Sequence, residues 1–456
     1  MKLLALLPWA LLRAGEPAAD VPQIPFEKYT LPNGLEVVLH EDHRIPEIAV
    51  DVWYKVGSKD EVMGRTGFAH LFEHVMFQGT KHVAEDKHFE YLQKAGASSV
   101  NGSTGTDRTN YFEVVPTNQL ELALWLESDR MGFLLERPGF KATLDNQRDV
   151  VKNERRQRVE NRPAGLVSKI LLEALYPPTH PYFHEVIGSM EDLSVASVED
   201  VKAFFRTHYV PGNATLTIAG DIDRARTKEL VDKYFGAIPA GPGAAATRSP
   251  PVAVPTPRLD APKRIAMEAK IQQPQLYVTY ISPPQFAPGD RELDLVANLL
   301  ANGKSSRLYR RLVYDLKIAQ SVSANQQSQK LTSTFEIVAS PMPGHAVDEL
   351  LAVIDEEIEN LRAAPPAERE VDRAKNQLES DVVRSLEAVL ARAERLQSYN
   401  DLVNDPGYVG EDLRLYRAVD AAAMQRAAAQ FLRKDARVVL TVEPNNDAPI
   451  MGRVKK

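Results

Sequence analysis

The chain has 456 residues, of which 44% are hydrophobic and 26% are charged, and its formal net charge is −7. Because this length exceeds what one hydrophobic core normally organises, two domains are expected. The mild negative charge gives no reason to expect a nucleic acid or an anionic membrane as a partner, and the absence of cysteine excludes disulfides, thiolate zinc ligands and a cysteine nucleophile.

The amino end carries a short apolar run, residues 3–12, which follows Lys2. This run has the length of a signal-peptide core and is too short to cross a membrane as a mature helix. We therefore expect residues 1–25 to be a signal peptide or a disordered leader. A signal peptide predicts a periplasmic or secreted protein without an integral membrane segment in the mature chain, and a disordered leader predicts a cytoplasmic one.

Beyond the leader, short β-prone runs alternate with long amphipathic helices. Residues 37–39, 48–53 and 276–280 are typical of strands, whereas residues 118–133 and 345–361 are typical of helices. This mixture predicts an α+β fold in which helices pack on one side of a mainly antiparallel sheet.

The pattern His-x-x-Glu-His occurs once in this region, as His70, Glu73 and His74. A helix places positions i and i+4 on one face, so the two imidazoles can bind one metal ion and Glu73 lies beside them. The alternative explanation of this pattern is that the two histidines are ordinary core or surface residues that bind no metal. A catalytic zinc ion needs three protein ligands and leaves its fourth position to water, so a third ligand is required.

Residues 144–162 are dense in charge and contain no Gly or Pro, which predicts an exposed or cleft-lining helix. This segment offers Asp149, Glu154 and Glu160 as candidates for the third ligand. Surface ion pairs are the better explanation of these acidic residues when composition alone is considered.

Two short matches at one offset indicate an internal repeat. Residues 112–115 (FEVV) recur as residues 335–338 (FEIV), and residues 152–154 (KNE) recur as residues 375–377 (KNQ), both 223 positions later. The same offset places Leu293, Val296, Ala297 and Gln377 at the positions of His70, Glu73, His74 and Glu154. The second copy therefore lacks every candidate metal-binding group and is expected to be non-catalytic.

The stretch from His70 to Glu154 resembles the inverted-zincin metallopeptidases of the pitrilysin type, the family of insulin-degrading enzyme and of the catalytic subunit of mitochondrial processing peptidase. That family combines a His-x-x-Glu-His helix with a distant glutamate, and Glu154 lies 80 positions after His74. Four further segments match in the same order, residues 31–35, 101–104, 107–112 and 209–213. The resemblance covers nearly the whole chain beyond the leader.

The resemblance implies one Zn²⁺ per chain, held by His70, His74 and Glu154. It implies a zinc-dependent endopeptidase of unfolded peptides that uses Glu73 as general base. It also raises Asn101, Gly102 and Ser103 to expected substrate contacts, on an edge strand to which an extended peptide adds. Composition alone allows this last segment to be an ordinary Ser/Gly-rich turn.

The domain boundaries follow from the repeat and from composition. Residues 239–262 are rich in Pro, Ala and Gly and predict a surface linker. We expect the catalytic metallopeptidase domain at residues 26–238, its non-catalytic repeat at residues 263–446 and a tail at residues 447–456.

One departure from the family pattern bears on partners. Peptidases of this type usually carry an Arg and, seven residues later, a Tyr in the companion half, but Val313 and Gln320 stand at the matching positions here. We therefore expect a heterodimer with a metal-free homologous subunit that supplies this pair, and a homodimer is the weaker alternative. A non-catalytic scaffold or assembly subunit of the same fold is the alternative function.

Overall fold

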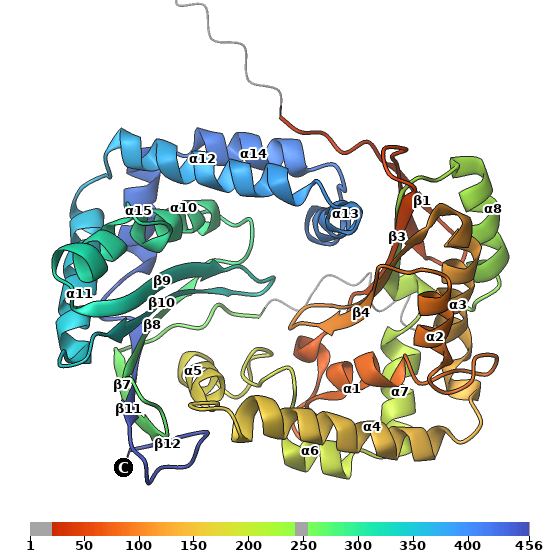
Figure 1. The fold of residues 1–456 in the computed structure, drawn as a ribbon, viewed down its shortest axis with the longest axis horizontal. Coiled ribbons are helices and arrows are strands. Elements are labelled where there is room, and N and C mark those ends of the chain that lie inside the picture. The colour runs from red at the N-terminus through yellow and green to blue at the C-terminus, as the bar shows by residue number, and fades with distance from the viewer. Residues whose placement is uncertain (1–20, 242–253, 456) are drawn as a thin grey trace, which may run out of the picture.

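A computed structural model describes residues 21–241 and 254–455 of the chain. Two six-stranded sheets face each other across the molecule, each with its own helices (Figure 1). Most of the predicted leader, residues 1–20, and the middle of the predicted linker, residues 242–253, lie outside the described residues. The boundary proposed at residues 239–262 falls between the last helix of the first half and the first strand of the second sheet.

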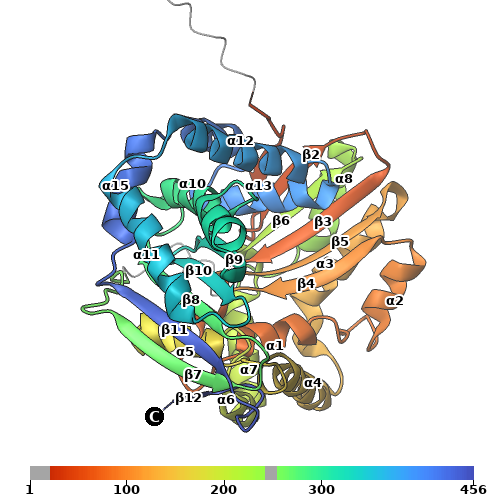
Figure 2. The same ribbon diagram turned by 60° about the vertical axis from the view of Figure 1, so that its left-hand side comes forward.

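The first sheet has the strand order β1-β2-β6-β3-β5-β4. Its strands are β1 (Glu27–Thr30), β2 (Glu36–Glu41), β3 (Glu47–Tyr54), β4 (Ser99–Thr104), β5 (Thr109–Pro116) and β6 (Ala214–Gly220). All neighbours are antiparallel except the pair β2 and β6. Strand β4 is consequently an edge strand with one side free of sheet partners, as the open row of strands in Figure 2 shows.

The second sheet has the order β12-β7-β11-β8-β10-β9, in which five strands repeat the topology of the first sheet and the outer strand comes from the opposite end of the chain. Its strands are β7 (Lys263–Ala269), β8 (Gln275–Ser282), β9 (Ala319–Gln327), β10 (Ser333–Pro341), β11 (Arg437–Pro444) and β12 (Arg453–Val454). The pair β7 and β11 is parallel, as are β2 and β6 in the first sheet. An offset of 223 takes β6 onto residues 437–443 of β11, so the repeat inferred from short sequence matches is a repeat of topology.

Helices flank both sheets. In the first half they are α1 (Phe68–Val75), α2 (Lys87–Lys94), α3 (Leu120–Phe133), α4 (Phe140–Arg155), α5 (Val167–Leu175), α6 (Met190–Val195), α7 (Val198–His208) and α8 (Arg224–Phe235). In the second half they are α10 (Asp290–Ala301), α11 (Val347–Ala363), α12 (Glu368–Ser385), α13 (Val389–Val403), α14 (Val409–Ala418) and α15 (Ala421–Phe431). The predicted α+β class with mainly antiparallel sheets is confirmed.

The two halves exchange helices. Helix α13 of the second half covers the face of the first sheet that its own helices leave open, where Ala393 packs against Ala49 and Ala219 (Figure 1). The Gln397 side chain on α13 donates hydrogen bonds to two carbonyl groups of the first sheet. In return, α5 of the first half packs its apolar side chains against β7 and β11. Each sheet therefore needs the other half to bury its second face.

The ends of the described chain take part in this packing. Ile24, which lies inside the predicted leader, is 4% exposed and packs against α13 and α14. Residues 447–456, expected to be a tail, include β12, which pairs with β7. The folded part therefore extends beyond both sequence-based boundaries because these segments cover apolar surface or a sheet edge. Among the described residues, no helix combines the length and apolarity needed to span a bilayer.

Leu396→Ala tests the helix exchange. Leu396 on α13 is fully buried against Val38 of the first sheet, so the substitution should lower the free energy of unfolding by about 2 to 5 kcal/mol. Chemical denaturation followed by circular dichroism should show one transition for both halves. Leu316→Ala, at a site that is 48% exposed, is the matched control and should change stability by less than about 0.5 kcal/mol. Two separate transitions, or equal effects of both substitutions, would contradict the exchange.

Candidate metal centre

The His-x-x-Glu-His pattern lies on α1, as predicted. Leu71, Phe72 and Val75 on this helix are buried in the core of the first half, which turns His70, Glu73 and His74 toward the opposite side. The two imidazole rings have centroids 4.9 Å apart. Helix geometry and an apolar face together therefore place both rings on one side of α1.

The start of α1 is held by a buried carboxylate. Glu61 accepts hydrogen bonds from the backbone N–H groups of Gly67 and Ala69, both at 2.8 Å. Gly67 adopts a φ of 90°, and a side chain there would approach the carbonyl oxygen of Ile187 to 2.8 Å. Glycine is thus required at this entry turn, and the direction of the metal-binding helix is fixed from its first residue.

Glu154 reaches the imidazole pair from α4, which packs against α1. Gln147 and Val151 are buried on α4, and Glu154 continues this face at i+3 from Val151. Its carboxylate oxygens lie 3.1 Å from His74 Nε2 and 3.7 Å from His70 Nε2. One donor atom from each of the three residues falls within 4.8 Å of the others.

The other two candidates for the third ligand lie elsewhere. Asp149 is exposed on α4, and Glu160, in the π-helical turn that follows α4, is paired with Arg155. The structure thus brings only Glu154, of the three acidic residues considered, to the histidines. Arg158, one turn beyond Glu154, forms an ion pair of 2.9 Å with its Oε1 atom, a contact that sequence analysis missed although the i,i+4 spacing permits it.

This donor set suits a zinc ion. Two imidazole nitrogens and one carboxylate are the protein ligands of one common class of catalytic zinc site, which keeps a further position open. Burial lowers the pKa of His70 to about 3, and the positive charge of Arg158 acts in the same direction. His70 is therefore neutral near pH 7, the form in which an imidazole nitrogen can bind a metal.

Glu73 lies beside the donor set and is held by the neighbouring edge strand. Its Oε2 atom accepts a hydrogen bond of 2.6 Å from the hydroxyl of Thr104. Burial raises the pKa of Glu73, and the hydrogen bond from Thr104 partly opposes this effect. A carboxylate with a raised pKa is better suited to accept a proton near neutral pH.

Strand β4 passes directly above α1. Gly102 permits this approach because a Cβ atom there would lie 3.1 Å from Glu73 Cγ and 3.2 Å from the rings of Phe77 and Tyr111. Ser103 is fixed by Arg108, whose guanidinium donates a hydrogen bond of 2.9 Å to the Ser103 carbonyl oxygen. Of the three predicted substrate contacts, Gly102 and Ser103 line the same cavity as the histidines, whereas Asn101 is exposed on β4 outside it.

This cavity, called the site cavity below, has a volume of about 750 Å³. It is lined by the three donors and Glu73, by β4, by His184 and Glu185, and by Gln327 and Gln329 of the second half. Sequence analysis identified no residue of the second half at the site, because such contacts have no local sequence signal. Val313 and Gln320, which stand where an Arg and a Tyr were sought, do not line the cavity.

The matching helix of the second half carries no metal donor at the equivalent positions. Leu293, Val296 and Ala297 on α10 are buried in the apolar core of that half. Gln377 on α12 donates hydrogen bonds to Asp381 on the same helix. At the positions of the two histidines and Glu73, the second half therefore has apolar core side chains, and at the position of Glu154 it has a glutamine bonded within its own helix.

A second cluster of metal-capable groups, His88, Glu113 and Glu127, is buried behind the site. Arg130, fully buried between these carboxylates, forms a two-pronged ion pair with Glu127 and stacks on the Phe77 and Tyr111 rings. The guanidinium occupies both Glu127 oxygens and repels a second cation. The cluster is therefore an internal ion pair, and it supports the Phe77 and Tyr111 rings that pack beneath Gly102 of β4.

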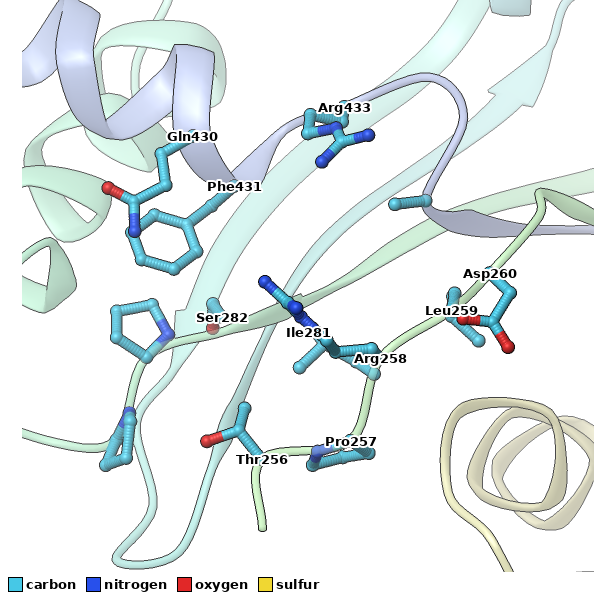
Figure 3. A pocket seen from close by; sticks show the side chains of 13 residues that line it. Thr256, Pro257, Arg258, Leu259, Asp260, Ile281, Ser282, Gln430, Phe431 and Arg433 are labelled. Carbon is cyan, nitrogen blue, oxygen red and sulfur yellow. The ribbon is translucent and has the colours of Figure 1, made fainter.

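A further cavity of about 550 Å³ lies in the second half, between the segment preceding β7 and the end of α15 (Figure 3). Its labelled polar side chains lie around the cavity and are those of Thr256, Arg258, Asp260, Ser282, Gln430 and Arg433. Arg433 is paired with Asp435. No imidazole lines this cavity, so the chemistry favours the site cavity.

Two family profiles match successive parts of the chain. Residues 36–181 match the family profile described as Insulinase (Peptidase family M16), and residues 196–378 match the one described as Peptidase M16 inactive domain. The first match contains all three donors, and the second contains the positions at which they are replaced.

Individual relatives agree with this assignment. The chain is 32% identical to a zinc protease, PqqE, of Helicobacter pylori, with 79% of this chain and 80% of the relative covered. It is 24% identical to a probable mitochondrial-processing peptidase subunit beta of Arabidopsis thaliana, with 94% and 80% covered. The crystal structure of pitrilysin superimposes with a TM-score of 0.79 at 19% identity and covers 98% of this chain, which corresponds to 48% of pitrilysin.

Glu113→Gln tests the buried ion cluster. Burial raises the pKa of Glu113 to about 8 from its model-peptide value of 4.5, against the opposing effect of Arg130. The proton that Glu113 holds in the folded state therefore stabilises the protein fully below about pH 4.5, and this contribution is lost as the pH rises through about 8. Between these pH values, the melting temperature of the wild type should fall relative to that of the Gln variant.

The measurement is differential scanning calorimetry of both proteins across this pH window. The exposed Glu368→Gln variant on α12 is the control and should follow the wild type at every pH. Parallel pH profiles for the wild type and Glu113→Gln would show that Glu113 carries no extra proton in the folded state.

Proposed function

The chain belongs to the M16 peptidase family, and we propose that it is a zinc-dependent endopeptidase that hydrolyses unfolded peptides. One observation carries this proposal. His70, His74 and Glu154 converge to within 4.8 Å, Glu73 lies beside them, and all four line a cavity that also borders the edge strand β4. Named relatives that are zinc proteases give independent support.

His70, His74 and Glu154 would hold one zinc ion per chain. Bound there, Zn²⁺ supplies Lewis acidity, which polarises a scissile carbonyl group and makes water more acidic. The imidazoles and the single carboxylate leave a net positive site, whereas thiolate ligands would weaken that acidity.

Glu73 is the general base in this proposal. It takes the proton from the attacking water and returns it to the leaving amine. Thr104 donates to the Oε2 atom of Glu73, which orients the carboxylate and leaves Oε1 for proton transfer. Partial burial raises the pKa of Glu73. Glu73 therefore holds the proton taken from water more readily than an exposed carboxylate would, until that proton passes to the leaving amine.

Strand β4 would bind the substrate. Its free edge offers main-chain N–H and C=O groups to an extended peptide, which would add to the sheet beside β4. We propose Gly102 and Ser103, which line the site cavity, and Asn101 on the same strand as the contacts. Main-chain hydrogen bonds do not read side chains, so sequence preference should be loose.

We propose that a metal-free homologous subunit completes the enzyme as a heterodimer, with a homodimer as the weaker alternative. The Arg and Tyr expected for substrate binding are replaced by Val313 and Gln320, and neither residue lines the site cavity. The chain corresponds to about half of pitrilysin, which leaves room for a second body of similar size. One similar protein is named as a subunit.

Two further points stay proposals. The apolar run at residues 3–12 supports export to the periplasm or secretion. The alternative function is a non-catalytic scaffold or assembly subunit of this fold, as the match of residues 196–378 to the inactive-domain profile allows. The complete donor set in the first half favours the enzyme, because a scaffold has no need of Glu73 beside three converging donors.

Substitutions at the donors and at Glu73 should have separable effects. Glu73→Gln should keep stoichiometric zinc and lose at least about 100-fold in kcat, because only proton transfer is removed. His70→Ala and Glu154→Gln should lose both zinc and activity. The measurements are zinc content by mass spectrometry and cleavage of a fluorogenic unfolded peptide, with and without a chelator.

His345→Ala is the matched control, because this histidine is part-exposed in the second half, where its imidazole pairs with Glu349. Its zinc content and activity should equal those of the wild type. Undiminished cleavage by Glu73→Gln would refute the role of the base, and a zinc-loaded wild type without any peptidase activity, alone or with its partner, would favour the scaffold.

The partner proposal predicts a gain on co-expression. With a metal-free homologue that carries the Arg and Tyr, kcat/KM should rise by about 100-fold or more over the chain alone, because a donor to the developing oxyanion is added. Light scattering should show a complex of one copy of each chain. Full activity of the isolated chain, unchanged by the homologue, would remove the need for a partner.

A further inference from the structure

The two sheets touch through equivalent hairpins. The turn between β4 and β5 meets the turn between β9 and β10 near the centre of the molecule (Figure 1). Asp107 and Lys330 lie in these turns and are separated by 223 positions, the offset of the repeat. The hairpin that carries the proposed substrate strand is therefore contacted by its own counterpart from the second half.

Specific hydrogen bonds fix this contact. Tyr182, which is 1% exposed, donates from its hydroxyl to Asp107 Oδ1 at 2.6 Å. The backbone N–H of Lys330 donates to Asp107 Oδ2 at 3.1 Å, and the backbone N–H of Leu331 donates to the Tyr182 hydroxyl at 3.1 Å. Two side chains of the first half thus bind the backbone of the second-half hairpin and fix its position.

The fixed hairpin carries two glutamines into the site cavity. Gln327 ends β9, Gln329 follows it, and both residues line the same cavity as Glu73 and the metal donors. Within the described part of the chain, neither carboxamide has a hydrogen-bond partner. Each carboxamide therefore offers a free donor and a free acceptor to whatever enters the cavity.

We propose that Gln327 and Gln329 form a substrate subsite that binds the main chain of the peptide from the side opposite β4. This inference rests on the proposed peptidase function and adds a role in substrate binding for the metal-free second half. Asp107 and Tyr182 are positioning residues for this subsite, because they hold the hairpin and act through the glutamines.

The chemistry of an extended peptide explains the match. A peptide added to β4 hydrogen-bonds to the sheet along one edge only, so the main-chain N–H and C=O groups of its other edge remain without sheet partners. A carboxamide supplies both complementary groups and carries no charge. Two carboxamides on the outer edge would therefore hold the peptide without selecting its side chains, which agrees with the loose preference expected from β4.

The test compares Gln327→Ala, Gln329→Ala and the double variant with the wild type. Loss of two neutral hydrogen bonds to the substrate should raise KM about tenfold in the double variant. The kcat value and zinc content should stay within about twofold, because the lost contacts are the same in the ground and transition states. Asn325→Ala, two residues away on β9 and outside the site cavity, is the matched control and should leave KM unchanged.

Tyr182→Phe tests the positioning role. The phenol hydroxyl is removed and the buried ring is kept, so KM should rise and kcat should not. In the Gln327→Ala/Gln329→Ala background, the same substitution should have no further effect on KM, since its effect passes through the glutamines. If Tyr182→Phe raises KM by the same factor in the double-variant background as in the wild type, Tyr182 has a general structural role and the positioning role is refuted.

A binding measurement separates this inference from the proposed function. Fluorescence anisotropy of a labelled unfolded peptide on the zinc-loaded Glu73→Gln protein should show an affinity about tenfold lower when both glutamines are replaced. If the wild type, alone or with its partner, cleaves the peptide but KM and affinity are the same without the glutamines, the subsite is refuted and the peptidase stands. If the wild type neither cleaves nor binds the peptide in either form, both proposals fall.

Discussion

The account depends on the packing of α4 against α1. Glu154 lies 80 positions after His74, and no local interaction brings it to the imidazole pair. The buried face of α4, with Gln147 and Val151, continues into Glu154, and the buried face of α1 turns both imidazoles to meet that carboxylate at 3.1 and 3.7 Å. Because packed helices cannot slide freely past one another, this apolar contact sets the geometry of the polar site.

The two halves use one topology for different purposes. In the first half the helix beside the edge strand presents His70, Glu73 and His74 to a cavity, whereas in the second half α10 buries Leu293, Val296 and Ala297 in its core. The second half nevertheless contributes to the first. Helix α13 covers the open face of the first sheet, and the hairpin between β9 and β10 completes the wall of the site cavity.

The sequence predicted the features that depend on local periodicity. The helical positions of His70 and His74, the strands and the α+β class follow from patterns within a few residues. Glu154 is different, because Asp149 and Glu160 share its segment. Only packing shows that Asp149 is exposed and that Glu160 is paired with Arg155. Resemblance selected Glu154, and physical reasoning from the segment alone did not.

Features that join distant segments had no signal in the sequence. The packing of α13 on the first sheet, the Arg130 cluster behind Phe77, and the reach of Gln327 and Gln329 into the site cavity all connect residues far apart in the chain. Asn101 shares β4 with Gly102 and Ser103 but lies outside the cavity lining, so its contact with the substrate stays a proposal.

The most direct test of the central claim is an anomalous-scattering map at the zinc absorption edge from crystals grown with zinc. The account predicts one dominant peak per chain, bonded to nitrogens of His70 and His74 and to a carboxylate oxygen of Glu154, with a further coordination position open to solvent. A dominant peak elsewhere, or a carboxylate of Glu154 turned away from a metal held by the two imidazoles, would contradict it.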